Sequence, residues 1–160
     1  MTEDFLASSI ELYGDMIYRV ALCRLQSVAD AEDVFQDTFL RLCQQKRAAA
    51  WEDEHLKAWL LKVAINLCND LGRKRQRQSP LNLENLPDLI CGGMEAGLEI
   101  WEAASHLPEK QRLVFHLYYG EDYQTREISR ILGMSETAVR VNLNRARSTL
   151  RKELKSSEEV

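Results

Sequence analysis

The segment YQTREISRILGMSETAVRVNLNRARSTLRKEL, residues 123–154, carries the clearest structural signal in this chain of 160 residues. Its first part predicts a short helix that turns Ile128 inward and ends at Gly133. Ser135 can then cap a longer helix, whose apolar residues recur at steps of three and four. That narrow apolar seam consists of Val139, Leu143, Ala146, Leu150 and Leu154. We therefore predict a helix-turn-helix.

The opposite face of the second predicted helix is polar and positively charged. Its N-terminal half offers side chains able to reach base edges, and its C-terminal half offers arginines suited to phosphates. An ordinary helical hairpin with a solvated charged face would show the same pattern. The residues on this face are Glu136, Thr137, Arg140, Val141, Asn144, Arg147 and Arg151.

A second basic segment lies near the middle of the chain, on a helix predicted from about residue 54 to Arg77. The apolar stripe of this helix consists of Leu56, Leu60, Val63, Leu67 and Leu71, with Trp59 beside it. The basic side chains suit a phosphate backbone, and the amides of Asn66 and Asn69 can bond to a base edge. Basic residues also suit the negative end of a helix dipole, so a solvated helix end remains an alternative. The cations are Lys57, Lys62, Arg73, Lys74, Arg75 and Arg77.

Two more amphipathic helices are predicted before this one. The first carries one apolar stripe that includes Phe5, Ile17 and Val20. Asp30 is predicted to cap the second, whose acidic first turn lies where the helix dipole favours negative charge. Three such helices can enclose one small core.

The net charge of −4 is distributed unevenly. Residues 1–56 contain 5 Lys and Arg against 11 Asp and Glu, whereas residues 57–77 contain 6 against 1. An acidic surface and a basic surface therefore adjoin. Because local clusters set the field at a binding face, a polyanionic partner is compatible with a pI of about 5.5.

Residues 78–98 read as a flexible linker, because they contain two of the three prolines and three glycines and lack a sustained hydrophobic period. The predicted fold is all-α, with two small helical domains joined by this linker. The first domain is assigned to residues 1–77 and the second, which contains the helix-turn-helix, to residues 99–155. Residues 156–160 are expected to form a frayed tail.

Several classes of function are not supported by the sequence. No apolar run reaches the roughly 18–20 residues needed to cross a bilayer, so we expect a cytoplasmic protein without direct membrane insertion. The four cysteines form no CxxC pair and are expected to be reduced. A di-iron site would need two Glu-x-x-His pairs, and only Glu52 and His55 have that spacing. Without nucleophile, P-loop or dinucleotide motifs, we expect no enzyme activity, no cofactor and no metal.

Three segments in this order, DAEDVFQDTFLRL (30–42), LKAWLLKVAINLCNDLGRKR (56–75) and the region 107–154, resemble the extracytoplasmic-function (ECF) group of bacterial RNA polymerase sigma factors. The resemblance implies an initiation factor that binds core RNA polymerase and promoter DNA. In that case residues 1–77 are similar to sigma region 2 and residues 99–155 to sigma region 4. Relatives of this kind are commonly held by an anti-sigma factor, which the resemblance implies as a further partner.

The resemblance also implies roles for individual residues. Docking on core polymerase is assigned to Asp30, Glu32, Asp33, Gln36 and Asp37. Binding of single-stranded DNA of the proximal promoter element is assigned to Asn66, which would hold a flipped base. The backbone of that strand is assigned to Lys62, Arg73, Lys74, Arg75 and Arg77. Binding of duplex DNA of the distal element is assigned to Thr125, Arg126, Arg140, Val141, Asn144, Arg145 and Arg147.

The chain departs from the family pattern in two places on the basic helix. Leu61 replaces a common aromatic residue and Ile65 a common arginine, which puts the base preference in question. The alternative interpretation is a stand-alone helix-turn-helix regulator. That alternative explains the C-terminal part of the chain but leaves Asn66 and the acidic surface without a role.

Overall fold

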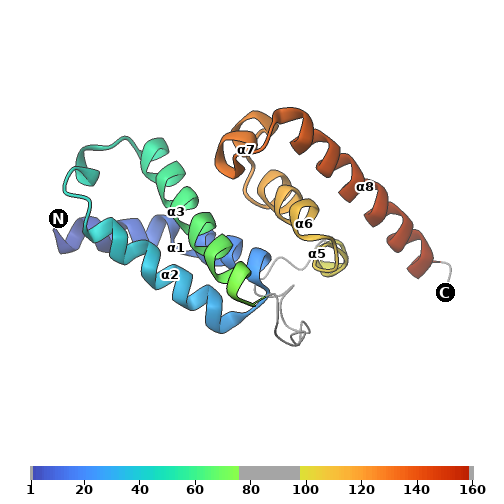
Figure 1. Cartoon of the computed structure of the whole chain (residues 1–160), viewed down its shortest axis with the longest axis horizontal. Helices are drawn as coiled ribbons and strands as arrows, with labels where there is room; N and C mark the ends of the chain where they lie inside the picture. The colour runs from blue at the N-terminus through green and yellow to red at the C-terminus, as the bar shows by residue number, and fades with distance from the viewer. Residues whose placement is uncertain (1, 76–97, 159–160) are drawn as a thin grey trace. The chain divides into compact units, whose positions relative to one another are not determined.

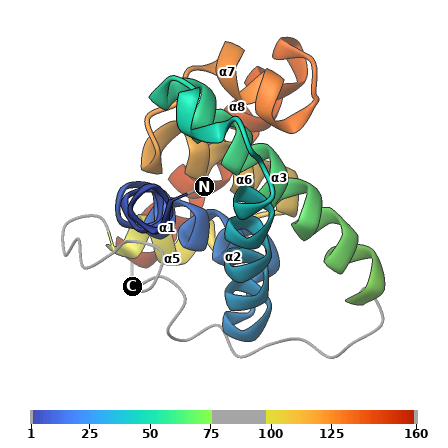
Figure 2. The same cartoon turned by 90° about the vertical axis from the view of Figure 1, so that its left-hand side faces the viewer.

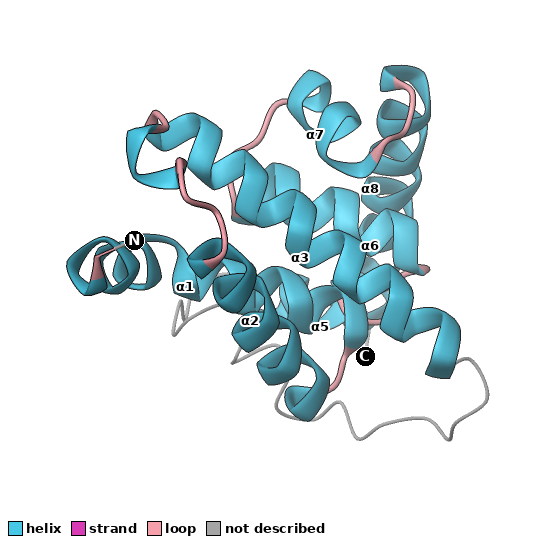
Figure 3. Cartoon of the chain, turned by 60° about the vertical axis from the view of Figure 1, so that its left-hand side comes forward, coloured by secondary structure: helices cyan, strands magenta, loops and turns pink. Residues whose placement is uncertain are grey.

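The computed structural model describes residues 2–75 and 98–158, and every regular element in those two ranges is helical (Figure 1, Figure 3). The predicted all-α class is therefore confirmed. The chain divides into two compact units, Met1–Pro80 and Leu81–Val160. The predicted linker, residues 78–98, lies outside the described residues except for Leu98, which begins a helix.

The first unit contains three long helices, α1 (Glu3–Leu25), α2 (Val28–Cys43) and α3 (Asp53–Arg75). A short 3-10 turn, η1 (Ala48–Ala50), lies between α2 and α3. Each long helix packs against the other two. Figure 2 shows α1 nearly end-on, with α2 beside it. The largest fully buried side chains of this core are Ile17, Val20, Leu22, Val34, Leu42, Leu60 and Leu61.

The turn between α1 and α2 corrects one prediction. Gln26 adopts a left-handed conformation with φ of 53°, and its backbone N–H donates to the Leu22 carbonyl at 2.8 Å. Ser27 is then the residue that caps α2, because its Oγ accepts the backbone N–H of Asp30 at 3.3 Å. The prediction that Asp30 caps this helix is wrong: Asp30 lies inside the first turn. Serine and aspartate are equally good caps, and the end of α1 places Ser27 first.

The buried face of α3 is wider than the single predicted stripe. Leu56 and Leu60 are buried as expected, but Val63, Leu67 and Leu71 are only half-buried. The remaining buried positions are Leu61, Ala64, Ile65 and Cys68. Because α3 packs against both α1 and α2, it needs two adjacent stripes facing inward.

The second unit contains α5 (Leu98–Ala104), α6 (Glu109–Phe115), the π-helical turn η2 (His116–Gly120), α7 (Thr125–Leu132) and α8 (Glu136–Glu158). The sequence predicts a helix that starts at Pro108 and continues past Phe115. Instead Pro108 is the N-cap, and the helix widens to the π form at His116. The predicted seam of α8 is confirmed at Val139, Leu143, Ala146 and Leu150, which are buried, while its last member, Leu154, is half-buried.

The turn between α7 and α8 has the predicted geometry. Gly133 has a φ of 67°, and its backbone N–H donates to the Ser129 carbonyl. The Ser129 hydroxyl donates to the Met134 carbonyl at 2.6 Å, which satisfies a second backbone group of the turn. Ser135 Oγ accepts the backbone N–H of Ala138 at 3.1 Å, so the predicted cap of α8 is confirmed.

Gly133→Ala is expected to lower the free energy of unfolding by about 1–2 kcal/mol, because a left-handed conformation is strained once a Cβ is present. No atom lies within 4 Å of the position of that Cβ, so the effect comes from the backbone and not from a clash. Thermal denaturation followed by circular dichroism measures it. Gly133→Asn is the matched control and should cost less, since asparagine tolerates this conformation. Equal losses in both variants would contradict the explanation.

Candidate nucleic-acid and protein-binding surfaces

One side of α2 carries an exposed polar surface, which we call the acidic surface. It consists of Glu32, Asp33, Gln36 and Asp37. Asp30 does not belong to it, because that residue of the first turn of α2 is only 2% exposed. A buried carboxylate cannot contact a partner without rearrangement, so Asp30 is left out of the docking surface proposed below.

The negative charge of the acidic surface affects a tyrosine on α1. Burial, together with the carboxylate of Glu32, raises the pKa of the half-buried Tyr18 above its usual value. A negative charge opposes ionisation of a nearby phenol and favours a nearby cation for the same reason. The acidic surface is thus suited to a positively charged partner.

A hollow of about 320 Å³ lies between α2 and α3, and three residues of the acidic surface line it. The exposed Asp70, which also lines this hollow, adds a fourth carboxylate to the three of the acidic surface, and sequence reasoning missed it. Asp70 lies within the basic segment of the sequence, and only the packing of α3 on α2 brings it near Asp33 and Asp37. The lining residues are Asp33, Val34, Gln36, Asp37, Leu67, Asp70 and Leu71.

Along α3, Lys62 and Asn66 are both exposed, and their spacing of four places them on one face of the helix. Leu61 and Ile65, the two departures from the family pattern, are buried. They therefore serve the core of the first unit and leave the polar face unchanged. Arg73, Lys74 and Arg75 belong to the last turn of α3, and Arg77 lies outside the described residues.

An aromatic cluster lies at the start of α3. The rings of Trp51 and His55 stack with centroids 4.6 Å apart and an interplanar angle of 5°, and Trp51 contacts Trp59 at 5.5 Å. Trp59 is half-buried, as its place beside the apolar stripe suggested. The cluster joins the segment before α3 to its first two turns.

The helix-turn-helix exposes most of the side chains predicted to contact duplex DNA. Arg126, Arg140, Val141, Asn144 and Arg145 are exposed, whereas Thr125 and Arg147 are half-buried. Glu136 organises part of this face: its Oε1 accepts a hydrogen bond from Arg140 at 2.8 Å and one from the Thr125 hydroxyl at 3.4 Å. The first turn of α8 is thereby tied to the start of α7.

Arg147 makes contacts that its sequence position did not predict. Its Nε donates to the Tyr119 hydroxyl at 2.8 Å, and its terminal NH1 group donates to Asn144 Oδ1 at 3.2 Å. The guanidinium carbon also lies 5.5 Å from the ring centroids of both Tyr118 and Tyr119. The residue assigned to phosphate contact is therefore held by its own unit.

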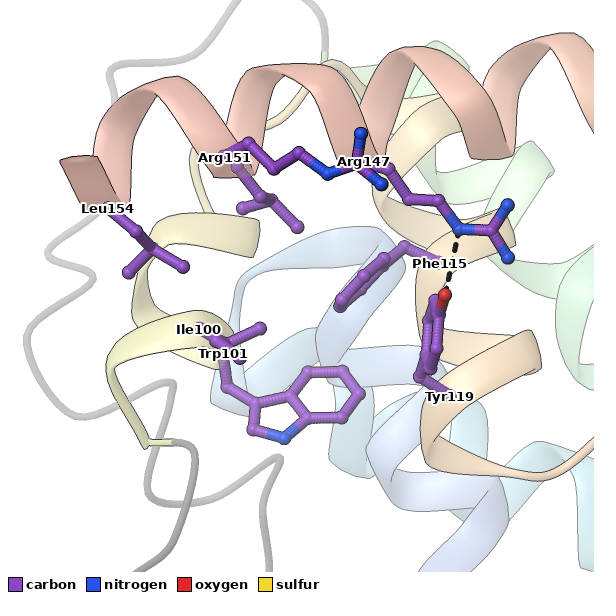
Figure 4. Close-up of a pocket in the computed structure, with 8 residues that line it drawn as sticks. Ile100, Trp101, Phe115, Tyr119, Arg147, Arg151 and Leu154 are labelled. Carbon is purple, nitrogen blue, oxygen red and sulfur yellow. Dashed lines mark hydrogen bonds between the residues drawn. The ribbon is translucent and has the colours of Figure 1, made fainter.

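Arg147 and Tyr119 also line an apolar groove of about 440 Å³ (Figure 4). Trp101 and Phe115 meet edge to face at 5.4 Å in this groove, while Arg147 and Arg151 come from α8. No pattern in the sequence indicates this groove. The lining residues are Ile100, Trp101, Phe115, Tyr119, Arg147, Leu150, Arg151 and Leu154.

Comparison with known sequences covers both units. The family model "Sigma-70 region 2" matches residues 10–78, and "Sigma-70, region 4" matches residues 97–150. The "Probable RNA polymerase sigma factor RfaY" of Xanthomonas campestris pv. campestris is 32% identical over 148 residues, 84% of this chain and 36% of RfaY. The chain thus spans about a third of that relative. The "ECF RNA polymerase sigma factor SigW" of Bacillus subtilis is 27% identical over 170 residues, 96% of this chain and 90% of SigW.

A solved structure has a similar fold. The sigma factor RpoE, crystallised with the anti-sigma factor NepR from Bartonella quintana, matches with a TM-score of 0.71. The two chains are 21% identical, and the match covers 96% of this chain and 98% of that one. Among the described helices, none is long and apolar enough to cross a membrane.

Proposed function

The chain is an ECF-type RNA polymerase sigma factor with sigma-70 regions 2 and 4, and from this we propose that its two units divide promoter recognition between an unpaired and a double-helical stretch of DNA. As a sigma factor it directs promoter recognition and transcription initiation as a non-catalytic subunit of the polymerase. The match of residues 10–78 to region 2 accounts for the part of the chain that a stand-alone regulator left unexplained. The functional modules are taken as residues 1–77 and 99–155.

The acidic surface of α2 docks on core polymerase in this proposal. Glu32, Asp33 and Asp37 are exposed on neighbouring turns, and Asp70 adds its charge across the hollow. Clustered carboxylates steer a basic partner and gain energy when paired with cations at the interface. The polymerase surface that fits this chemistry is a basic helical one.

The polar face of α3 binds the unpaired strand of the proximal element. Asn66 holds an extruded base by its edge, while Lys62 and the cations at the end of the helix hold the backbone. Opening duplex DNA costs about 1.4 kcal/mol per stacked step, so contacts made only to the unpaired strand favour the open state selectively. Support comes from the exposure of Asn66 and Lys62 on one face.

The helix-turn-helix reads the distal element as duplex DNA, and one observation carries this assignment most directly. Arg140, Val141 and Asn144 are exposed, while the seam of α8 is buried in the second unit. A helix presented in this way can place its first turns in the major groove. Thr125, Arg126 and Arg145 are assigned to the phosphates that fix its register.

Run-off transcription with purified core polymerase tests the whole proposal. Holoenzyme reconstituted with this chain should produce discrete transcripts from genomic DNA fragments, and core polymerase alone should not. If the chain bound promoter duplex but supported no transcript with core polymerase, the proposed division of labour would be wrong.

Arg140→Ala is expected to weaken binding of the holoenzyme to its promoter by about 1–3 kcal/mol, with a much smaller loss on random duplex. The reason is that a base contact carries sequence information and a phosphate contact does not. Gel-shift titrations on both duplexes measure the two losses. Arg151→Ala, which removes an exposed charge farther along α8, is the control and should affect both duplexes alike. If Arg140→Ala weakened binding to the promoter and to random duplex equally, Arg140 would not read a base.

We also propose an anti-sigma partner and a cytoplasmic site of action. RpoE, whose structure resembles this fold, was crystallised with the anti-sigma factor NepR. A sigma factor acts where the polymerase and the chromosome are. The expected finding is a protein that competes with core polymerase for this chain in a binding assay.

A further inference from the structure

Arg147 links two surfaces of the second unit through hydrogen bonds of one side chain. On one side its Nε donates to the hydroxyl of Tyr119, which lines the groove shown in Figure 4. On the other side its NH1 donates to Oδ1 of Asn144, which is exposed on the DNA-facing side of α8. The two donor–acceptor distances are 2.8 and 3.2 Å.

The chemistry of the three side chains makes this arrangement directional. Arginine carries its donors in a rigid planar fork, so fixing Nε also fixes the direction in which NH1 points. The two tyrosine rings, each 5.5 Å from the guanidinium carbon, hold that plane further. A hydrogen bond at Oδ1 in turn orients the Asn144 carboxamide, with its oxygen toward Arg147 and its NH2 group away from it.

We propose that Arg147 is a positioning residue that orients the Asn144 amide for contact with a base edge and is itself oriented by Tyr119. The inference rests on the proposed function, in which Asn144 faces the distal promoter element. It replaces the assignment of Arg147 to a phosphate. A guanidinium that is half-buried and already bonded to two neighbours would lose those contacts in reaching for the DNA backbone.

The oriented amide has a consequence for base preference. With Oδ1 bonded to Arg147, Asn144 presents its NH2 group as a donor. In the major groove, guanine offers N7 and O6 as acceptors, and thymine offers O4. Adenine also offers N7 as an acceptor, but asparagine normally reads adenine through a donor and an acceptor together, and here the Oδ1 acceptor is already engaged by Arg147. We therefore expect guanine or thymine opposite Asn144.

The decisive variant is Tyr119→Phe, which removes one hydroxyl from the groove wall and changes no charge. Holoenzyme carrying it is titrated against the promoter duplex and against duplexes with each base pair of the distal element replaced in turn. If Arg147 positions Asn144, Tyr119→Phe lowers discrimination roughly 3- to 10-fold, the scale of one or two weakened hydrogen bonds. The loss falls at the same base pair as for Asn144→Ala, and combining the two substitutions adds nothing further.

A phosphate role for Arg147 predicts a different result. Tyr119→Phe would then leave discrimination unchanged, and Arg147→Gln would weaken binding to all duplexes equally while lowering the salt slope by about 1. That outcome overturns the inference. Under the positioning role Arg147→Gln instead loses discrimination at the Asn144 base pair, and its salt slope stays the same.

Two controls separate the possible failures. Tyr118→Phe keeps a ring at the same 5.5 Å distance from the guanidinium and leaves the bond to Tyr119 in place, so it should bind like the parent protein. If Asn144→Ala changes no base preference, the proposed function of Asn144 is wrong. If Asn144→Ala changes the preference but Tyr119→Phe does not, the positioning role alone is wrong. Thermal denaturation checks that each variant remains folded.

Discussion

Replacing Asp33 and Asp37 together by alanine is expected to reduce the affinity of the chain for core RNA polymerase by at least about 30-fold, the equivalent of about 2 kcal/mol. The two carboxylates lie four residues apart on the exposed face of α2 and both line the hollow shared with α3. Truncating one partner of a desolvated charge pair also leaves the opposing cation unpaired, which makes the loss large. Equilibrium titration of labelled protein with core polymerase measures it.

The control for this experiment is the pair Glu11→Ala and Asp15→Ala. These residues are also exposed carboxylates four residues apart, but they lie on α1. Their substitution removes the same net charge as that of Asp33 and Asp37. Their loss of affinity should be small and should disappear as salt is raised, because distant surface charges act only through the screened field. Similar losses in both double variants would show that net charge, and not the acidic surface, controls binding.

Asp30 provides an internal comparison. Because its side chain is buried in the first turn of α2, Asp30→Ala should lower the free energy of unfolding and change polymerase binding much less than the double variant. The sequence could not make this distinction. Asp30, Asp33 and Asp37 recur at steps of three and four. The helical pattern alone does not reveal that the side chain of one of them is buried.

The helices themselves were predictable because periodic apolar residues and capping residues are local signals. Gly133 and Ser135 determine the turn before α8 through contacts that span only a few residues. The position of Asp70 beside Asp33 was not predictable, because it depends on how two helices pack. The widening at His116 was missed because a single π-helical turn is too short to change the apolar period of the sequence.

The same limit explains Arg147. Its place in a run of arginines on α8 predicts phosphate contact, whereas its closest polar partner, Tyr119, lies 28 residues earlier. Charge composition identifies a surface that attracts DNA, but hydrogen bonds across the fold decide which cations are available to it. Assignments of single basic residues from sequence are therefore weaker than assignments of the whole surface.

Asn66→Ala is expected to reduce transcription from a duplex promoter by about 5- to 150-fold, the equivalent of losing one specific base contact of about 1–3 kcal/mol. Binding to core polymerase should not change, because Asn66 lies outside the acidic surface and the hollow. The loss should appear in the open complex, since only an unpaired base exposes its Watson–Crick edge to this amide. Permanganate reactivity of unpaired thymines and run-off transcription measure opening and output separately.

Asn69→Ala is the matched control, because it makes the same change three residues farther along α3 at a half-buried position. A template in which one base of the proximal element is absent then identifies the partner of Asn66. On the template lacking the captured base, parent protein and Asn66→Ala should open DNA equally well, because the contact is missing in both. If the variant remained defective on every such template, Asn66 would act through the shape of α3 and not through a base. Selective stabilisation of the unpaired strand would then have to come from the cations alone.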